Sequence, residues 1–372
     1  MSGAASATAG WFQRLILPGL AFKAAVIGGG YATGRELVEF FMPGGPWGGL
    51  GGILVAMLVW SVVCAMTFVF ARMTGAGDYR SFFRALLGRG WVVFEIAYFV
   101  FIVLVLAVFG AAAGEIGVSM FGWPPLVGTL LLIVGVVGFA AFGNAVVEAL
   151  FKYVSFLLYA VYAIFLVLCL AGFGDQIAAT FTGPAVEPVK TGANWALSGL
   201  SYASYNVIGA VVILPVVRHM TSRRDAVVAG LIAGPLAMAP ALLFFVCMMA
   251  FYPGIGAEKL PSDFMLAQLN LPIFRALFQL MIFAALLESG VGFLHAINER
   301  VSGAWAARRD TPFPAVLRGG ISGVFLIGAI FLAAKVGLID LIASGYGAFG
   351  YIMLAIFVLP LMTLGLWRVM RK

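Results

Sequence analysis

Apolar residues run along this chain in long, nearly uncharged stretches. Ten such stretches cover roughly residues 14–41, 47–73, 91–121, 124–142, 145–172, 192–218, 225–252, 268–300, 315–336 and 341–367. A run of about 20 apolar residues is long enough to cross the hydrocarbon core of a bilayer as a helix. The pattern therefore predicts an all-α polytopic membrane protein with ten transmembrane helices. Because the first stretch is too long for a signal-peptide core, we expect no cleaved export signal.

Two of these stretches are interrupted in a similar way. The first reads Gly-Gly-Gly-Tyr-Ala-Thr-Gly over residues 28–34, and the second reads Ser-Tyr-Ala-Ser-Tyr-Asn over residues 201–206. The shared Tyr-Ala-(Thr/Ser) pattern begins at Tyr31 and again at Tyr202, an offset close to half of the 372 residues. Paired interruptions at matching positions of two halves are typical of the midplane binding site of a secondary transporter.

The polar stretch 173–191 divides the chain between the fifth and sixth predicted spans. We therefore expect a first five-helix repeat over residues 1–172, an outer loop over 173–191, and a second five-helix repeat over 192–372. Since five spans is an odd number, the second repeat enters the membrane from the side opposite to the first. The two repeats are then inverted, with their pseudo-two-fold axis in the membrane plane.

Composition and charge agree with a membrane protein. Hydrophobic residues make up 63% of the chain and charged residues 10%, with a mean hydropathy of +1.09, whereas soluble domains are nearer half apolar and a quarter charged. With a cytoplasmic N-terminus, the inner segments hold 15 of the 22 Lys and Arg residues and the outer segments hold four. This asymmetry predicts cytoplasmic N- and C-termini. The basic loops, which explain the net charge of +7, suit anionic lipid and give little support to nucleic-acid binding.

Enzymatic and metal-binding motifs are missing from the sequence. The three cysteines are dispersed through apolar stretches, and the two histidines lack the His-Glu-x-x-His spacing of zinc proteases. No phosphate-binding loop or Gly-x-Ser-x-Gly elbow occurs. We therefore predict no enzymatic activity, no metal site and no cofactor.

The glycine-rich interruption suggests how a solute is held. Three glycines at 28–30 weaken a helix by roughly 1 kcal/mol each relative to alanine. Unwinding there would free carbonyls before the break and amides after it, and the amides with the helix dipole attract an anion such as a carboxylate. The alternative is that these glycines only allow close packing of another helix.

Three motifs carry a resemblance to a known family. Residues 28–41, which read Gly-Gly-Gly-Tyr-Ala-Thr-Gly-Arg-Glu-Leu-Val-Glu-Phe-Phe, are similar to the first-helix signature of the YkvI-type amino acid permeases. Residues 202–207 with 212–215 resemble that family's sixth-helix motif, and residues 288–292 with 298–300 resemble its eighth. The resemblance implies the LeuT-type 5+5 inverted-repeat fold of the amino acid–polyamine–organocation superfamily, with helices 1 and 6 broken. It also implies amino acid transport in a bacterial inner membrane.

The predicted substrate site lies at the two interruptions. Glu36 is a candidate either for capping freed amides or for binding the amino group of the substrate. Around the second interruption, aromatic side chains would close over a solute while Ser and Asn supply directional hydrogen bonds, unless Tyr205 only packs against neighbouring helices. The candidate substrate-binding residues are Gly28, Gly30, Tyr31, Ala32, Thr33, Gly34, Glu36, Tyr202, Ser204, Tyr205 and Asn206.

Two charged residues within the first half are candidates for gating and coupling. Arg35 either forms a local ion pair with Glu39, four residues on, or serves as the outer-gate or carboxylate-binding residue that the resemblance implies. Lys152 lies four residues after Glu148, so the two can neutralise each other. The resemblance offers another role, because some proton-coupled members carry a fifth-helix lysine where sodium-coupled members bind sodium.

The eighth span adds Glu288, Ser289 and His295 as coupling candidates, although His295 is equally consistent with a structural role. Glu288, His295 and Glu299 recur at spacings of seven and four residues and so form one polar stripe. Sodium sites of LeuT-type proteins use eighth-helix hydroxyls, and the resembling family tends to have two adjacent ones. Here Ser289 is followed by Gly290, which favours a proton over sodium as the coupling ion.

The combined prediction is a proton-coupled symporter for a small amino acid or related zwitterion that works by alternating access. Two alternatives remain open. Glu36, Glu115 and Glu288 also suit an organic cation, such as an amine or guanidinium compound. An ion channel would need a continuous pore and repeated filter segments, and the sequence shows no such repeats.

Overall fold

Helices joined by short connections make up the molecule. The computed structural model describes the chain except residues 1–9, 27–28, 142–143, 184–193, 307–313 and 372, and this described part contains no strand. In the first half the helices, with 3-10 and π-helical segments marked η, are η1 (Phe12–Ile16), α1 (Leu17–Val26), α2 (Gly29–Ala32), α3 (Arg35–Phe41), η2 (Met42–Gly44), α4 (Gly45–Thr74), α5 (Tyr79–Leu87), η3 (Gly88–Gly90), α6 (Trp91–Phe121), α7 (Pro125–Ala141) and α8 (Asn144–Thr182).

The second half ends in a C-terminal segment rich in π-helix. Its elements are α9 (Trp195–Asn206), α10 (Ile208–Val212), η4 (Leu214–His219), α11 (Arg223–Met248), η5 (Met249–Phe251), η6 (Gly254–Ala257), α12 (Pro261–Gln268), α13 (Pro272–Ala306), α14 (Ala315–Val336), α15 (Leu338–Asp340), η7 (Leu341–Tyr346), α16 (Gly347–Met353), η8 (Leu354–Val358), η9 (Leu361–Gly365) and α17 (Leu366–Met370).

Seven helical segments of the described residues are long and apolar enough to cross a membrane. They are Arg35–Thr74, Tyr79–Phe121, Leu157–Thr182, Arg223–Phe251, Pro272–Ser302, Gly319–Val336 and Leu338–Met370. The predicted span at 124–142 is represented by a shorter apolar helix, Pro125–Phe139. The regions 14–41 and 192–218 are each divided into short helical pieces. The all-helical membrane class is thus confirmed, while the count of ten spans stays a prediction.

The exposed surface of the long helices is apolar. Leu54, Leu58 and Val62 recur every four residues along α4 with between 39% and 65% of each side chain exposed, and Val324 and Ile327 form a similar row on α14. Rows of this kind would be an aggregation liability in water, whereas in a bilayer they face lipid chains. The exposed rows are therefore the surfaces that contact the membrane.

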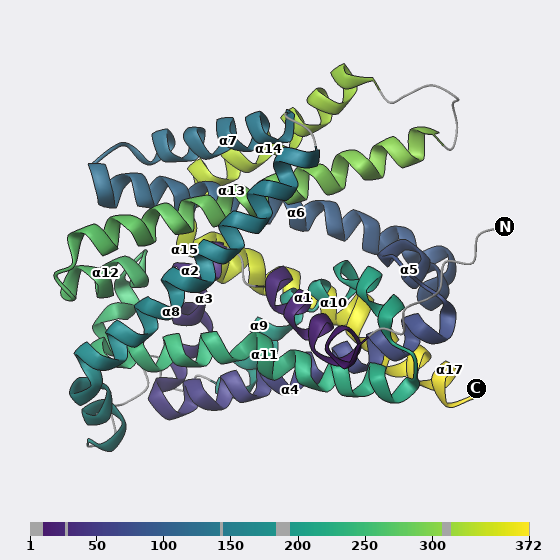
Figure 1. Cartoon of the computed structure of the whole chain (residues 1–372), viewed down its shortest axis with the longest axis horizontal. Helices are drawn as coiled ribbons and strands as arrows, with labels where there is room; N and C mark the ends of the chain where they lie inside the picture. The colour runs from purple at the N-terminus through teal and green to yellow at the C-terminus, as the bar shows by residue number, and fades with distance from the viewer. Residues whose placement is uncertain (1–9, 27–28, 142–143, 184–193, 307–313, 372) are drawn as a thin grey trace.

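Small residues allow the central helices to approach one another closely. A Cβ atom added to Gly230 of α11 would lie 2.3 Å from the Cα atom of Ala65 in α4, and one added to Gly234 would lie 2.2 Å from the Ser61 hydroxyl. Helices in membranes associate through such small-residue contacts because no hydrophobic force drives them together. The α4–α11 pair packs beside α9, as Figure 1 shows.

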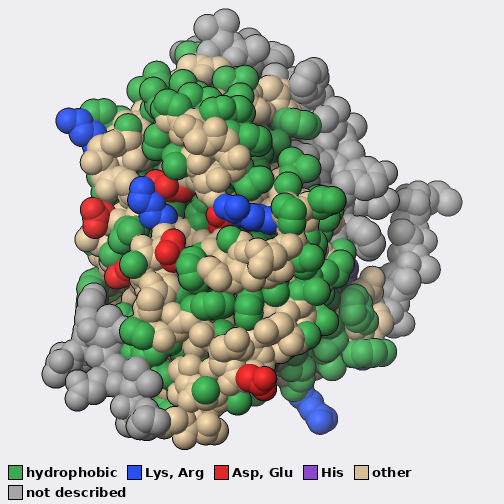
Figure 2. Space-filling model, turned by 90° about the vertical axis from the view of Figure 1, so that its left-hand side faces the viewer, with side chains coloured by type: hydrophobic (Ala, Val, Ile, Leu, Met, Phe, Trp, Pro, Cys, Tyr) green, Lys and Arg blue, Asp and Glu red, His purple; other side chains and the backbone are tan. Residues whose placement is uncertain are grey.

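The two ends of the molecule carry different charged groups. Helices α5 and α17 lie at one end and α12 lies at the other, which we call the α5 end and the α12 end (Figure 1). At the α5 end, Arg72 donates to the Met220 carbonyl at 3.2 Å, and Arg14 lies 3.5 Å from Asp225. Figure 2 views the α12 end, where side chains of both signs gather between apolar ones. The basic loops predicted to be cytoplasmic thus include those of the α5 end.

Candidate functional site

The first predicted interruption is present, but its described break lies later than the triple glycine. Residues 29–32 form the helical turn α2, and the chain leaves helical geometry at Thr33 and Gly34. Gly34 adopts a φ of +82°, in the left-handed region that glycine reaches without steric penalty. Of the three glycines at 28–30 where unwinding is predicted, Gly29 and Gly30 belong to α2, so the described break lies after them. Gly28 lies outside the described residues.

The backbone groups freed by this break find partners within the protein. The Gly34 N–H donates to the Tyr31 carbonyl at 3.0 Å, and the Arg35 N–H donates to the Thr33 hydroxyl oxygen at 3.2 Å. The Thr33 carbonyl accepts a hydrogen bond from the Ser262 N–H of α12 at 3.0 Å. The break thus fastens the start of α3 to the α12 end.

The second interruption is milder. Helix α9 ends at Asn206 and α10 begins at Ile208, while Val207 keeps helical dihedral angles and donates to the Ala203 carbonyl at 3.1 Å. The Ala210 N–H donates to Val207 at 2.9 Å, three residues back, so the helix is tightened here rather than unwound. A larger departure follows at Ile213, where the chain continues into the 3-10 segment η4.

The two interrupted segments meet through one buried hydrogen bond. The Tyr205 hydroxyl donates to Oε2 of Glu36 at 2.7 Å, and only 2% of Tyr205 and 6% of Glu36 are exposed. The ring of Tyr205 stacks on Tyr346 from η7, with 4.6 Å between centroids and 26° between planes. The indole N–H of Trp60 donates to the Ala203 carbonyl at 3.1 Å and holds α9 against α4. Glu36 is therefore fixed in position from three elements.

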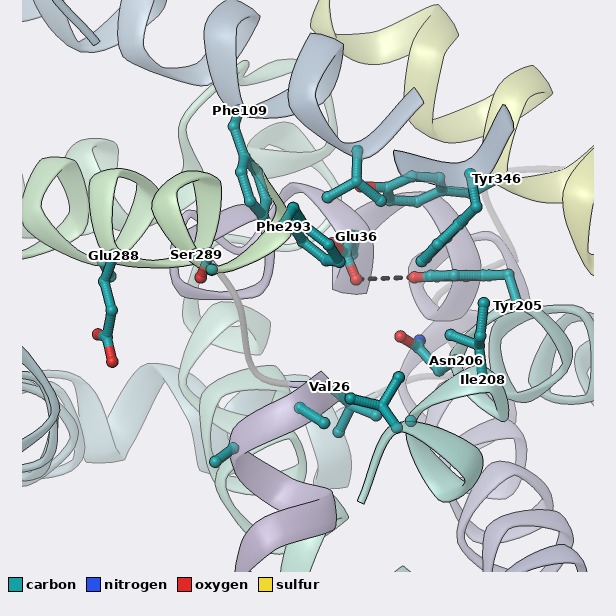
Figure 3. Close-up of a pocket in the computed structure, with 18 of the residues that line it drawn as sticks. Val26, Glu36, Phe109, Tyr205, Asn206, Ile208, Glu288, Ser289, Phe293 and Tyr346 are labelled. Atoms are coloured by element: carbon teal, nitrogen blue, oxygen red, sulfur yellow. Dashed lines mark hydrogen bonds between the residues drawn. The ribbon is translucent and has the colours of Figure 1, made fainter. Parts of the chain in front are cut away.

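A pocket of about 360 Å³ opens beside this hydrogen bond. Five of the predicted residues line it: Glu36, Tyr205, Asn206, Glu288 and Ser289. Figure 3 shows Glu36 between Tyr205 on one side and Ser289 on the other, while Glu288 points away from the Glu36–Tyr205 pair. Helices α1, α6, α8 and α10 supply most of the remaining lining, which is largely apolar or aromatic.

Several predicted substrate residues do not line this pocket. Tyr31, Ala32, Thr33, Tyr202 and Ser204 are buried at the interruptions. Tyr202 packs edge-on against Phe41, with 4.8 Å between ring centroids, and the Ser204 hydroxyl donates to the Ser201 carbonyl at 2.7 Å. These side chains shape the helices that carry Glu36 and Tyr205. Gly30 belongs to α2 and Gly34 to the turn after it, and neither is among the lining residues.

The guanidinium of Arg35 is directed toward the connection before α12 and not into the pocket. It donates to the carbonyls of Gly256 and Glu258 at 3.0 and 2.9 Å, and it pairs with Glu39 at 3.0 Å. The local ion pair with Glu39, one of the two predicted roles of Arg35, is thus present. The same guanidinium also makes the two hydrogen bonds to the distant carbonyls. His295 is half-buried in α13 away from the lining, and Lys152 lies on α8 with its side chain outside the described residues.

The aromatic lining was not predicted from the sequence. It comprises Tyr98, Phe101, Phe109, Tyr159, Phe293 and Tyr346. Tyr98, Phe101 and Phe109 follow helical spacing on one face of α6, but in an apolar span this spacing is equally typical of lipid-facing or core residues. Tyr346 stands in a Gly-Tyr-Gly sequence that favours a hinge or close packing. No sequence signal separated these rings from other aromatic residues.

A polar cluster surrounds Asp263 of α12, a residue that lies outside the segments long enough to span the membrane. Arg275 donates to both carboxylate oxygens at 2.7 Å, Gln279 donates to Oδ1 at 2.7 Å, and Ser119 contacts Oδ2. Burial opposes ionisation of this carboxyl group, but the hydrogen bonds and the positive charge of Arg275 prevail and lower the pKa of Asp263. The cluster ties α12 to α6 and α13.

Comparison with known proteins identifies one related membrane protein and the fold of this chain. No protein-family model matches the chain. It is 27% identical over 355 residues to the uncharacterised membrane protein YkvI of Bacillus subtilis (strain 168), an alignment that covers 90% of this chain and 91% of YkvI. The crystal structure of MhsT in complex with L-phenylalanine matches 95% of this chain and 96% of MhsT, with a TM-score of 0.57 and 17% identity.

A second solved structure matches to a similar extent. It is the crystal structure of a mutant of the Eremococcus coleocola manganese transporter. The match covers 93% of this chain and 78% of the transporter chain, with a TM-score of 0.59 and 15% identity. At these identities the solved structures establish the fold. The chain is therefore a homologue of the YkvI membrane protein and has the LeuT-type fold that MhsT and the manganese transporter share.

Proposed function

We propose that this protein is a secondary active transporter that moves a small amine-bearing solute across a bacterial inner membrane by alternating access. An amino acid or related zwitterion is the solute class that the sequence predicts. The observation that carries the proposal is the pocket of about 360 Å³ with the buried Glu36 carboxyl group at the meeting point of the two interrupted segments. The LeuT-type fold supports transport, and the site supports an amine.

Glu36 is the proposed partner of the ammonium group. Its Oε2 atom is occupied by the Tyr205 hydroxyl, a bond that orients the carboxyl group beside the pocket. Hydrogen bonds between an ammonium and a carboxylate are short and roughly twice as strong as neutral ones. Asn206 and Ser289 supply further polar atoms from α9 and α13. These groups would fix one end of the solute while the aromatic walls enclose the rest.

Coupling to protons rather than sodium is the second part of the proposal. Glu36 and Glu288 both line the pocket, and a carboxyl group can take up and release a proton. The eighth-span hydroxyl Ser289 stands beside Gly290, so the second hydroxyl of the family's pattern is missing. Lys152 and His295 remain coupling candidates from the sequence.

The proposed cycle uses the contacts at the α12 end. In the predicted topology the termini are cytoplasmic, ten spans form two inverted five-helix repeats, and the α12 end faces outward. Arg35 with the Gly256 and Glu258 carbonyls would then form an outer closure. Opening would break these contacts as the first, second, sixth and seventh spans move against the remaining helices.

Uptake into proteoliposomes tests the proposal. A panel of labelled amino acids and amines is offered to the purified full-length protein with an imposed pH gradient, a sodium gradient, or neither. We expect accumulation that depends on the pH gradient and is lost in Glu36→Gln. The matched control is Glu115→Gln, because Glu115 pairs at 2.8 Å with the largely exposed Lys259, away from the pocket lining. Absence of gradient-driven accumulation of any solute, or full uptake by Glu36→Gln, would contradict the proposal.

A further inference from the structure

The chemistry of the pocket walls narrows the class of solute. Resting on the transport function above, we propose that the pocket recognises an ammonium group joined to an aromatic or branched apolar body, and that it needs no carboxylate on the solute. An arylalkylamine would then be as good a ligand as the amino acid with the same side chain, or a better one.

Aromatic rings surround the position beside Glu36. Phe101 stacks on Phe349 at 4.5 Å between centroids, Tyr205 stacks on Tyr346, and the rings of Phe109 and Phe293 lie 6.2 Å apart. The negative faces of such rings attract a cation, and a desolvated cation–π contact is worth about 2 kcal/mol. The same rings offer apolar surface to a hydrophobic body. Both ends of an aromatic amine are thus accommodated.

The charged groups of the pocket favour a cation. Its described lining residues include the carboxyl groups of Glu36 and Glu288 and contain no Lys, Arg or His. The Tyr205 hydroxyl proton is already donated to Glu36, and one Asn206 amide N–H is donated to the Tyr202 carbonyl at 3.2 Å. A solute carboxylate placed here would lose its water without gaining a cationic partner from this lining, and that loss weakens binding.

The chain itself places an ammonium on one of these walls. The Nζ atom of Lys23 lies 4.3 Å from the ring centroid of Tyr159, and Tyr159 lines the pocket. The ring of Tyr159 thus already holds one ammonium at cation–π distance. Lys23 does not itself line the pocket. Because its ammonium group lies against a ring that does, Lys23 is the cation to test as a partner for a solute carboxylate.

The size of the pocket is consistent with a compound as large as an aromatic amine. About 360 Å³ lies toward the lower end of the range for small-molecule pockets, roughly 300 to 1,000 Å³. Each ring or branch that fills this space removes apolar surface from water at about 25 cal/mol per Å². A short amine such as ethylamine would leave most of the aromatic surface without contacts.

Isothermal titration of the purified full-length protein tests the inference with four probes: phenethylamine, L-phenylalanine, ethylamine and L-alanine. We expect phenethylamine to bind at least as tightly as L-phenylalanine, and roughly 30-fold or more tightly than ethylamine. Glu36→Gln should weaken both aromatic probes by roughly tenfold or more, because each loses the same ammonium partner. Glu115→Gln should change neither.

Other results would overturn the inference. Binding of L-phenylalanine but not phenethylamine would show that the carboxylate is required, and loss of that difference in Lys23→Met would identify its partner. Equal binding of the aromatic and short probes would refute the role of the aromatic walls. Proteoliposome uptake separates the failure of this inference from the failure of the transport function. If one of these binding results is found but L-alanine or L-phenylalanine is still accumulated by gradient-driven uptake that needs Glu36, only the inference fails. If no solute is accumulated, the transport function fails as well.

Discussion

Replacing Gly34 by alanine should damage the first break through two separable effects. At its φ of +82°, an alanine side chain costs about 1 to 2 kcal/mol of backbone strain. The added Cβ would also lie 2.7 Å from Cζ of Phe244 and 3.2 Å from Cβ of Pro261, an overpacking that costs about 1 to 3 kcal/mol. The two effects together predict a loss of about 2 to 5 kcal/mol in the free energy of unfolding.

Two other glycines separate strain from packing. Gly75 has a φ of +70° with no atom within 4 Å of an added Cβ, so Gly75→Ala carries the strain alone, about 1 to 2 kcal/mol. Gly138 lies inside α7, also with open space, so Gly138→Ala should stabilise the helix by about 0.5 to 1 kcal/mol. Thermal unfolding of the purified variants in detergent measures the order of their melting temperatures.

The expected order runs from Gly138→Ala, at or above the unchanged protein, through Gly75→Ala to Gly34→Ala, which should melt at the lowest temperature. A Gly34→Ala variant that melts with Gly75→Ala would show that the contacts with Phe244 and Pro261 relax freely. A Gly34→Ala variant that melts with the unchanged protein would refute the assignment of the break to this residue.

Two further predictions concern the pocket and the α12 end. Tyr205→Phe keeps the ring that stacks on Tyr346 but removes the donor to Glu36, so amine affinity measured by titration should fall roughly tenfold, and unchanged affinity would contradict the orienting role. Asp263→Asn leaves Arg275 without its bidentate partner and should lower the free energy of unfolding by about 2 to 4 kcal/mol, seen as a lower melting temperature. Because the folded-state pKa of Asp263 is lowered, its stabilisation is present above the unfolded pKa of about 4 and is lost as the pH falls through the folded pKa. The difference between the two proteins should therefore shrink in acid, and a constant difference down to pH of about 2 would contradict this account.

The sequence predicted the all-helical membrane class and the approximate places of the two interruptions. It also singled out Glu36, Tyr205 and Asn206, which the structure brings to one pocket. These residues were recognisable because polar groups are rare within apolar spans, and each needs a partner or a cavity. A charged or amide side chain in such a span is therefore informative by itself.

Other features of the site have no comparable signal. The exact break depends on the dihedral angles of Gly34, and composition cannot show which glycine of the segment takes a positive φ. The ring of Tyr346 and the two carbonyl partners of Arg35 come from segments more than 200 residues away from α3. Arg35 is held partly by main-chain carbonyls, which every residue carries, so no pattern of side chains in that segment could have revealed the contact.

The attachment of α3 to the α12 end is made mainly through peptide groups. The Thr33 carbonyl accepts from the Ser262 N–H, and two of the three Arg35 partners are carbonyl oxygens. A side-chain scan of residues 254–262 would leave these atoms in place and would not report on this attachment. The segment can therefore diverge in sequence between relatives while its hydrogen bonds to Thr33 and Arg35 persist. A substitution that removes a backbone N–H, such as proline at Ser262, would test this attachment, whereas alanine substitutions would not.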